Sequence, residues 1–207
     1  MKPAFAQLRR VRRSPSGGGG TLGVLISGRG SNLQAILDAI REGRLKAQVG
    51  VVLSNVAGAP GLERARAAGV PAEVLPHKDC PSRERYDEAL VERLRAYEVD
   101  VVCLAGFMRL LSPVFVRAFP GRILNVHPSL LPSFPGLHAQ RQALEHGVKV
   151  TGATVHIVDE ELDHGPILLQ SAVPVLEGDD EDSLSARILE QEHKIYPEAI
   201  ALVLERK

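Results

Sequence analysis

Residues 21–40, TLGVLISGRGSNLQAILDAI, decide the expected fold of this chain. The run Leu22–Ser27 is short and apolar, as in a buried strand, and Leu33–Arg44 carries apolar residues at helical spacing. Between them, Gly28 and Gly30 mark a tight turn. The stretch therefore predicts a strand, a glycine-rich turn and a helix, the opening unit of an α/β sheet.

The same alternation continues along the chain. Apolar and amphipathic runs predict, in order, a strand at Val49–Ser54, a helix at Gly61–Ala68, a strand at Ala72–Leu75, a helix at Arg83–Tyr97, a strand at Val99–Ala105, a helix at Ser112–Phe119 and a strand at Arg122–His127. Strands that read as continuous Val, Ile and Leu, joined by helices, are typical of parallel sheets covered on both faces. We expect an α/β fold with a mostly parallel, doubly wound (Rossmann-like) sheet flanked by helices.

The pattern changes after the strand that ends at His127. It predicts a Pro-rich loop at 128–137, a helix at His138–His146, strands at Val150–Val158 and Ile167–Val175, and a helix from Leu184 to about Glu205. The connection Asp159–Pro166 between these strands is longer than a tight hairpin turn. We expect the strands to add antiparallel to the sheet. Pro197 is expected to kink or restart the last helix.

Composition indicates one globular domain without a membrane segment. The 207 residues are 44% hydrophobic and 24% charged, and a chain of this length supports a single core. Its apolar runs fall well short of the roughly 20 residues that a spanning helix needs. We expect residues 1–20 to form a disordered basic arm and 21–207 a single domain.

The distribution of charge argues against a nucleic-acid partner. Residues 1–20 hold five of the 25 basic residues and no acid, which leaves 20 basic against 25 acidic residues in the remainder. A mildly acidic body does not offer the basic face that phosphate backbones require. Cys80 and Cys103 lie in unlike contexts, so no disulfide is expected, and the N-terminal stretch lacks the apolar run of a signal peptide. We expect a cytoplasmic protein.

The turn Ser27–Leu33 has two interpretations. Backbone N–H groups between a strand and a helix can bind a phosphate, or the glycines can merely permit positive φ while Ser31 or Asn32 caps the helix. A dinucleotide fingerprint is disfavoured, because position 33 is Leu rather than a third glycine. The second strand also ends without an acid for a ribose. We therefore expect a monophosphate site rather than an NAD site.

Asn125 and His127 are the first candidate reactive pair. They are spaced by two at the end of an otherwise apolar parallel strand, so they share one face of the sheet at the edge where ligands bind. Their alternative role is to anchor the Pro-rich loop that follows. Asp163 lies among four carboxylates in the 159–166 connection, and Gly165-Pro166 after it favours a loop that returns to the sheet edge.

Four separated stretches carry a resemblance to a known family. They are Asn125-Val-His-Pro-Ser-Leu-Leu-Pro132, Pro135-Gly-Leu-His138, Gly152-Ala-Thr-Val-His156 and Leu162-Asp-His-Gly-Pro166. In this order and spacing they resemble the folate-dependent formyltransferases, and among them those that act on glycinamide ribonucleotide. The resemblance runs from about Gly23 to Pro197. It implies transfer of the formyl group of 10-formyltetrahydrofolate to that substrate, a step of purine biosynthesis.

The resemblance also implies roles for particular residues. The catalytic set is Asn125, His127 and Asp163; the substrate phosphate is bound by Gly30, Ser31 and Asn32; Glu192 binds the substrate; and Arg83, Met108, Arg109, Leu110 and Leu111 bind the folate. As a mechanism we expect Asn125 and a protonated His127 to donate hydrogen bonds to the developing oxyanion. Asp163 is expected to keep His127 charged and relay a proton, with its pKa raised toward neutrality by partial burial.

Arg29 and His164 depart from the family pattern, and other functions are compatible with the same fold. Arg29 stands at a variable place in the glycine turn, and His164 stands where a glycine is common, so His164 is expected to influence the protonation of Asp163. No metal is expected, since the histidines lack the spacing of a zinc site. Relatives that formylate methionyl-tRNA or hydrolyse formyltetrahydrofolate carry an additional domain, which we do not expect here. A non-catalytic binding module is a further alternative, and a homodimer is compatible with the sequence.

Overall fold

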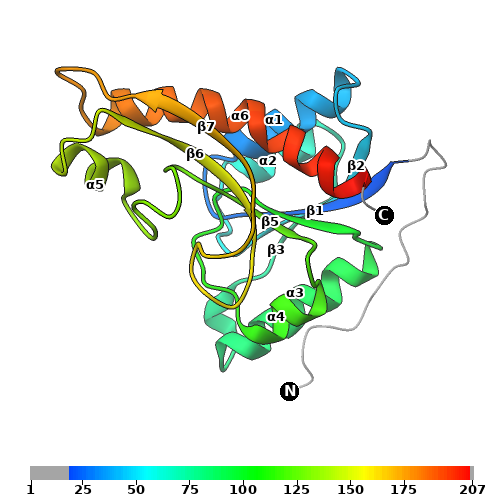
Figure 1. The fold of residues 1–207 in the computed structure, drawn as a ribbon. Helices are drawn as coiled ribbons and strands as arrows, with labels where there is room; N and C mark the ends of the chain where they lie inside the picture. The colour runs from blue at the N-terminus through cyan, green and yellow to red at the C-terminus, as the bar shows by residue number, and fades with distance from the viewer. Residues whose placement is uncertain (1–18, 206–207) are drawn as a thin grey trace.

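The computed structural model describes residues 19–205, built around a seven-stranded sheet of order β3-β2-β1-β4-β5-β6-β7 (Figure 1). The strands are β1 (Gly20–Ile26), β2 (Ala47–Ser54), β3 (Ala72–Val74), β4 (Val101–Leu104), β5 (Ile123–His127), β6 (Val150–Ile157) and β7 (Ile167–Pro174). The first five pair in parallel, whereas β6 pairs antiparallel with both β5 and β7. The predicted mostly parallel sheet with antiparallel strands in the C-terminal part is confirmed.

Helices cover both faces of this sheet (Figure 1). One face carries α1 (Ser31–Arg41), α2 (Gly61–Ala67) and α6 (Glu181–Glu205), and the other carries α3 (Arg83–Ala96) and α4 (Pro113–Ala118). A short helix α5 (Ala139–Glu145) packs against α6, and a 3₁₀ turn η1 (His77–Asp79), which the pattern did not predict, precedes α3. No helix within residues 19–205 has the length and apolar character needed to cross a membrane.

The strands are apolar on both sides because they separate two cores. In β1, Val24 and Ile26 pack with α1 and α6, while Leu25 between them packs with α3 and α4. All three side chains are fully buried. This two-sided burial explains why the parallel strands read as unbroken apolar runs.

The order of the strands fixes where a ligand can bind. The chain runs outward from β1 to β2 and β3, then returns to place β4 on the other side of β1. The loops after β1 and β4 therefore leave the sheet in opposite directions and open a crevice at its carboxyl edge. The glycine turn follows β1, and the segment Ala105–Leu111 follows β4.

Two expectations about the ends of the chain need revision. Residues 1–18 of the predicted arm lie outside the described residues, but Gly20 is already the first residue of β1. At the other end, α6 is one continuous helix with Pro197 inside it, so the expected restart is wrong. An internal proline costs about 3 kcal/mol. Burial of the flanking turns offsets this cost. Tyr196 is fully buried, and the backbone oxygens of Leu104 in β4 and Leu124 in β5, at 2.9 and 3.0 Å, share the one hydrogen of its hydroxyl.

Candidate active site

The structure brings Asn125, His127 and Asp163 together at the end of β5. The Asn125 Nδ2 atom lies 3.4 Å from Asp163 Oδ1, and His127 Nδ1 lies 3.4 Å from Asp163 Oδ2. The side chains of His127 and Asp163 are 6% and 8% exposed, so they face each other with little intervening water. The predicted convergence of the β6–β7 loop on the sheet edge is therefore observed.

Both ring nitrogens of His127 face acceptors. Nε2 lies 2.9 Å from the backbone oxygen of Phe134, and Nδ1 faces the Asp163 carboxylate. A neutral imidazole carries a single N–H, whereas an imidazolium donates from both nitrogens. The arrangement suits a protonated His127.

Asp163 is held as an acceptor by groups from several parts of the chain. Burial alone raises the pKa of its carboxyl, but the nearby His156, the N–H of Gly136 at 2.8 Å and the nearby His127 together hold that pKa below its usual value. The expectation that partial burial would move this pKa toward neutrality is therefore wrong. Asp163 is an ionised carboxylate at neutral pH.

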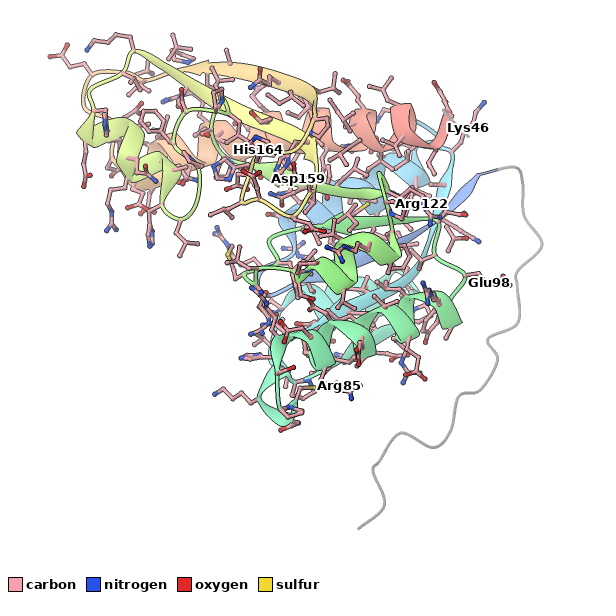
Figure 2. All side chains as sticks on the ribbon, turned by 60° about the horizontal axis from the view of Figure 1, so that its bottom comes forward. Lys46, Arg85, Glu98, Arg122, Asp159 and His164 are labelled. Atoms are coloured by element: carbon pink, nitrogen blue, oxygen red, sulfur yellow. The ribbon has the colours of Figure 1, made fainter. Side chains whose placement is uncertain are left out.

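His164 does not act on Asp163. Its Nδ1 atom lies 3.0 Å from Asp159 Oδ2, and Figure 2 shows the two labelled residues next to each other. Both side chains are solvent-exposed. The hydrogen bond with Asp159 raises the pKa of His164. Burial raises the pKa of Asp159, but its hydrogen bonds with His164 and with the N–H of Glu161 outweigh burial, so that pKa is lowered. The expected influence of His164 on the protonation of Asp163 is not supported, because His164 pairs with Asp159 instead.

The glycine turn leaves the first turn of α1 open. Gly30 is the N-cap residue with φ +70°, and no side chain caps the helix, so the capping role considered for Ser31 or Asn32 is wrong. Gly28 does not have positive φ. A Cβ on Gly30 would lie 2.7 Å from the Cα of Gly61 in α2, so this position requires glycine for two reasons. The free N–H groups of α1 are a suitable site for an anion.

Glu192 joins this turn from the distant helix α6. Its Oε2 atom accepts a hydrogen bond of 2.6 Å from Asn32 Nδ2, and the carboxyl is 7% exposed. Burial raises the pKa of Glu192, and the hydrogen bond from Asn32 opposes that rise. The Oδ1 atom of Asn32 is buried without a hydrogen-bond partner in the described part of the chain. The pair thus offers an unused polar atom beside the turn.

A cavity of about 710 Å³ joins these features. Its lining includes residues 27–32, Gly106, Met108, Pro128 and Glu192. It lies at the crevice that the strand order predicts, next to the residues that flank Asn125 and His127.

The remaining predicted residues lie around the segment after β4. Met108 and Leu110 are large apolar side chains with 69% and 56% exposure, and Leu111 packs partly into the core. The Arg109 guanidinium lies 5.0 Å from the ring centre of Tyr86. Arg83 begins α3 and is half-exposed. Exposed apolar side chains beside a cavity are typical of a binding surface.

Comparisons with known proteins agree with this arrangement. Residues 22–200 match the formyl transferase family. The chain belongs to this family. It is 55% identical over 178 residues to phosphoribosylglycinamide formyltransferase of Escherichia coli (strain K12), covering 86% of this chain and 84% of that protein. The crystal structure of glycinamide ribonucleotide transformylase 1 from Symbiobacterium toebii superposes with a TM-score of 0.90 at 60% identity, over 95% of this chain and 92% of that one.

Other relatives in the family are much longer proteins. The chain is 54% identical over 200 residues to the trifunctional purine biosynthetic protein adenosine-3 of Drosophila pseudoobscura pseudoobscura, which covers 96% of this chain. It spans only 15% of the length of that relative.

Sequence reasoning missed part of this formyl transferase site. His156 is 2% exposed, and its Nε2 atom lies 3.2 Å from Asn125 Nδ2 and 3.7 Å from Asp163 Oδ1. Its place on β6, beside Asn125 on β5, was visible only once the antiparallel register was known. Phe134 contributes only a backbone oxygen, at φ +55°, and no side-chain pattern signals such a contact.

Within residues 19–205, no three His, Cys, Asp or Glu side chains gather as metal ligands would. The expectation that the reaction needs no metal stays a prediction.

Proposed function

We propose that the chain transfers the formyl group of 10-formyltetrahydrofolate to the amine of glycinamide ribonucleotide, as a step of purine biosynthesis. The observation that carries the proposal is the convergence of Asn125 and His127 on Asp163, each with a nitrogen 3.4 Å from its carboxylate, beside the cavity. Amide, imidazolium and carboxylate groups in such an arrangement suit acyl transfer, which needs oxyanion donors and a proton carrier.

The acceptor substrate would bind at the glycine turn. The uncapped N-terminus of α1, with Gly30, Ser31 and Asn32, suits the phosphate of glycinamide ribonucleotide because no acid lies in its first turn. Glu192 and the unpaired Oδ1 atom of Asn32 supply acceptors for hydroxyl or amine groups further along the substrate. The amine then reaches toward the end of β5.

The donor would bind on the other side of the cavity. Met108, Leu110 and Leu111 offer apolar surface for the pteridine ring system. Arg83 and Arg109 provide two cations for the carboxylates of the glutamate tail. We propose one domain for residues 21–207, with phosphate binding in its N-terminal half and folate binding and catalysis in its C-terminal half.

The side chains then divide the chemistry as follows. When the amine nitrogen attacks the formyl carbon, the carbonyl electron pair moves to oxygen, and His127 and Asn125 donate hydrogen bonds to that oxygen. His127 gives up its contact with the Phe134 oxygen to do so, and Asn125 gives up its longer contact, the 3.4 Å one with Asp163. Ionised Asp163 accepts a proton from the attacking nitrogen and delivers it to the departing folate nitrogen as the carbon–nitrogen bond breaks. The sequence of steps uses no metal.

The direct test is incubation with 10-formyltetrahydrofolate, with and without glycinamide ribonucleotide. Release of tetrahydrofolate that depends on the amine supports the proposal. Release without the amine instead supports a hydrolase, and binding of both compounds without any release supports a non-catalytic module.

The role of Asp163 is tested by the substitution Asp163→Asn. We expect kcat to fall by about 10²–10⁴ at saturating substrates, the usual contribution of a general acid–base group. Asp159→Asn is the matched control, because Asp159 lies on the same loop but pairs with the exposed His164. Near-wild-type turnover of the Asp163→Asn protein would remove Asp163 from the mechanism.

A further inference from the structure

Ser27 links the two loops that border the cavity. It follows β1 and begins the glycine turn, and its hydroxyl donates to Asn55 Oδ1 at 2.6 Å. The same oxygen accepts a hydrogen bond of 2.8 Å from the backbone N–H of Met108. The backbone N–H of Ser27 donates to the oxygen of Gly106 at 3.1 Å.

These contacts tie together the carboxyl ends of three adjacent strands. Asn55 follows β2, Ser27 follows β1, and Gly106 and Met108 follow β4. Since a serine hydroxyl has one hydrogen, its donation to Asn55 leaves its lone pairs to receive the Met108 N–H. One side chain therefore bridges the crevice at the point where the order of the strands reverses.

The two loops are not equally well held without this hydroxyl. The glycine turn has a second anchor, because the oxygen of Gly28 accepts a 3.0 Å hydrogen bond from Gly61 of α2. The Met108 side chain is 69% exposed, so it adds little packing to hold its own segment. Removing the hydroxyl would leave the backbone bond from Ser27 to Gly106 in place but would release the N–H of Met108, so the end of the segment that carries Met108 would lose more than the glycine turn.

We propose that Ser27 is a positioning residue that couples the glycine turn to the segment carrying Met108. This inference rests on the proposed function, in which the turn binds the phosphate of the acceptor and the segment binds the folate. A phosphate bound at the turn restrains residues 28–32, and the hydroxyl of Ser27 carries that restraint to the Met108 backbone. Each substrate then strengthens the binding of the other by the same factor, as linkage requires.

The coupling is measured with tetrahydrofolate, which has no formyl group to transfer. Its dissociation constant is determined calorimetrically with and without saturating glycinamide ribonucleotide. In the unmodified protein we expect the constant to fall at least about fivefold when the nucleotide is present, the lower end of typical couplings. In Ser27→Ala we expect the ratio of the tetrahydrofolate dissociation constants, measured without and with the nucleotide, to approach one. The affinity for glycinamide ribonucleotide alone should change less than about twofold.

Three further variants separate coupling from general damage. Ser27→Thr retains a hydroxyl and should restore the ratio. Ser27→Cys keeps a similar volume, but its sulfur is a weak hydrogen-bond acceptor, so it should lower the ratio. If the alanine variant does not fold, the cysteine variant tests the coupling in its place. Ser171→Ala is the control, because it removes a hydroxyl that joins β7 to Gln191 of α6 and contacts neither the glycine turn nor the segment after β4. It should leave the ratio of the two dissociation constants unchanged.

The outcomes distinguish this inference from the proposed function. If the unmodified protein shows no amine-dependent release of tetrahydrofolate, the proposed function fails. If release occurs but the nucleotide does not change tetrahydrofolate affinity, or if Ser27→Ala keeps the full ratio, coupling through Ser27 is refuted and the function stands.

Discussion

Replacement of Gly30 by alanine should damage both the stability of the fold and the binding of the phosphate. Gly30 has φ +70°, where an L-residue with a Cβ costs roughly 1–2 kcal/mol. The added Cβ would also lie 2.7 Å from the Cα of Gly61, a backbone atom that cannot rotate away. Overpacking of this kind costs about 1–3 kcal/mol. Together the two effects predict a loss of about 2–5 kcal/mol in the free energy of unfolding.

Gly69→Ala is the matched control for this prediction. Gly69 has φ +71°, but no atom lies within 4 Å of the Cβ that alanine would add. It should therefore lose only the backbone part, roughly 1–2 kcal/mol. Both variants are measured by urea unfolding, and the difference between them isolates the collision with Gly61. Thermal unfolding should show the same order, with a fall of roughly 2–4 °C for each kcal/mol.

Gly30→Ala should also change the kinetics, because the collision with Gly61 pushes the glycine turn away from α2. If α2 and the glycine turn move apart, the N–H groups at the start of α1 are displaced from the proposed phosphate site. We expect the KM for glycinamide ribonucleotide to rise in Gly30→Ala while kcat changes much less, because the cluster around Asp163 is untouched. Equal stability of Gly30→Ala and Gly69→Ala would refute the close-approach argument, and an unchanged KM would refute the phosphate site.

Three further predictions concern titratable groups. Glu192→Gln should raise the Tm at pH 8 more than at pH 5, and it should raise the KM for glycinamide ribonucleotide. Burial raises the pKa of Glu192 in the folded state, so its carboxyl destabilises the fold as the pH rises through that pKa. A gain in Tm that does not depend on pH would contradict this reasoning. Asp163→Asn should be less stable than the unmodified protein at pH 7, because a carboxyl whose pKa is lowered on folding stabilises the fold at any pH above its usual pKa. Urea unfolding should show that this loss of unfolding free energy shrinks below about pH 4. His164→Ala should leave the pH–rate profile unchanged because His164 pairs with Asp159, and a displaced profile would restore a role for it.

The sequence predicted the fold well where one physical cause dominated. Two-sided burial forces the parallel strands to be apolar throughout, so their runs stand out from the amphipathic helices between them. The spacing of Asn125 and His127 on one strand likewise determined that they share a face, because side chains alternate along any strand.

Properties that depend on distant contacts could not be predicted in the same way. The pKa of Asp163 is lowered by Gly136, His127 and His156, which come from a loop and two strands that meet only in the folded chain. Burial, visible as a tendency in the sequence, acts in the opposite direction. Adjacency in sequence pointed instead to His164, which pairs with Asp159 in the exposed part of the loop.

The lowered pKa of Asp163 changes how catalysis is expected to work. A carboxyl poised near neutrality would share its proton with the substrate, but an ionised carboxylate places a negative charge beside His127 before any substrate arrives. The Phe134 oxygen lies at the other ring nitrogen, so both nitrogens of His127 face oxygen acceptors. In the proposed mechanism, His127 and Asn125 are already held at this edge of the sheet, and each exchanges one existing contact for the formyl oxygen as negative charge develops on it. In the proposed mechanism, Asp163 therefore contributes first by its charge, and as a proton carrier only once the attacking amine has become acidic through bond formation.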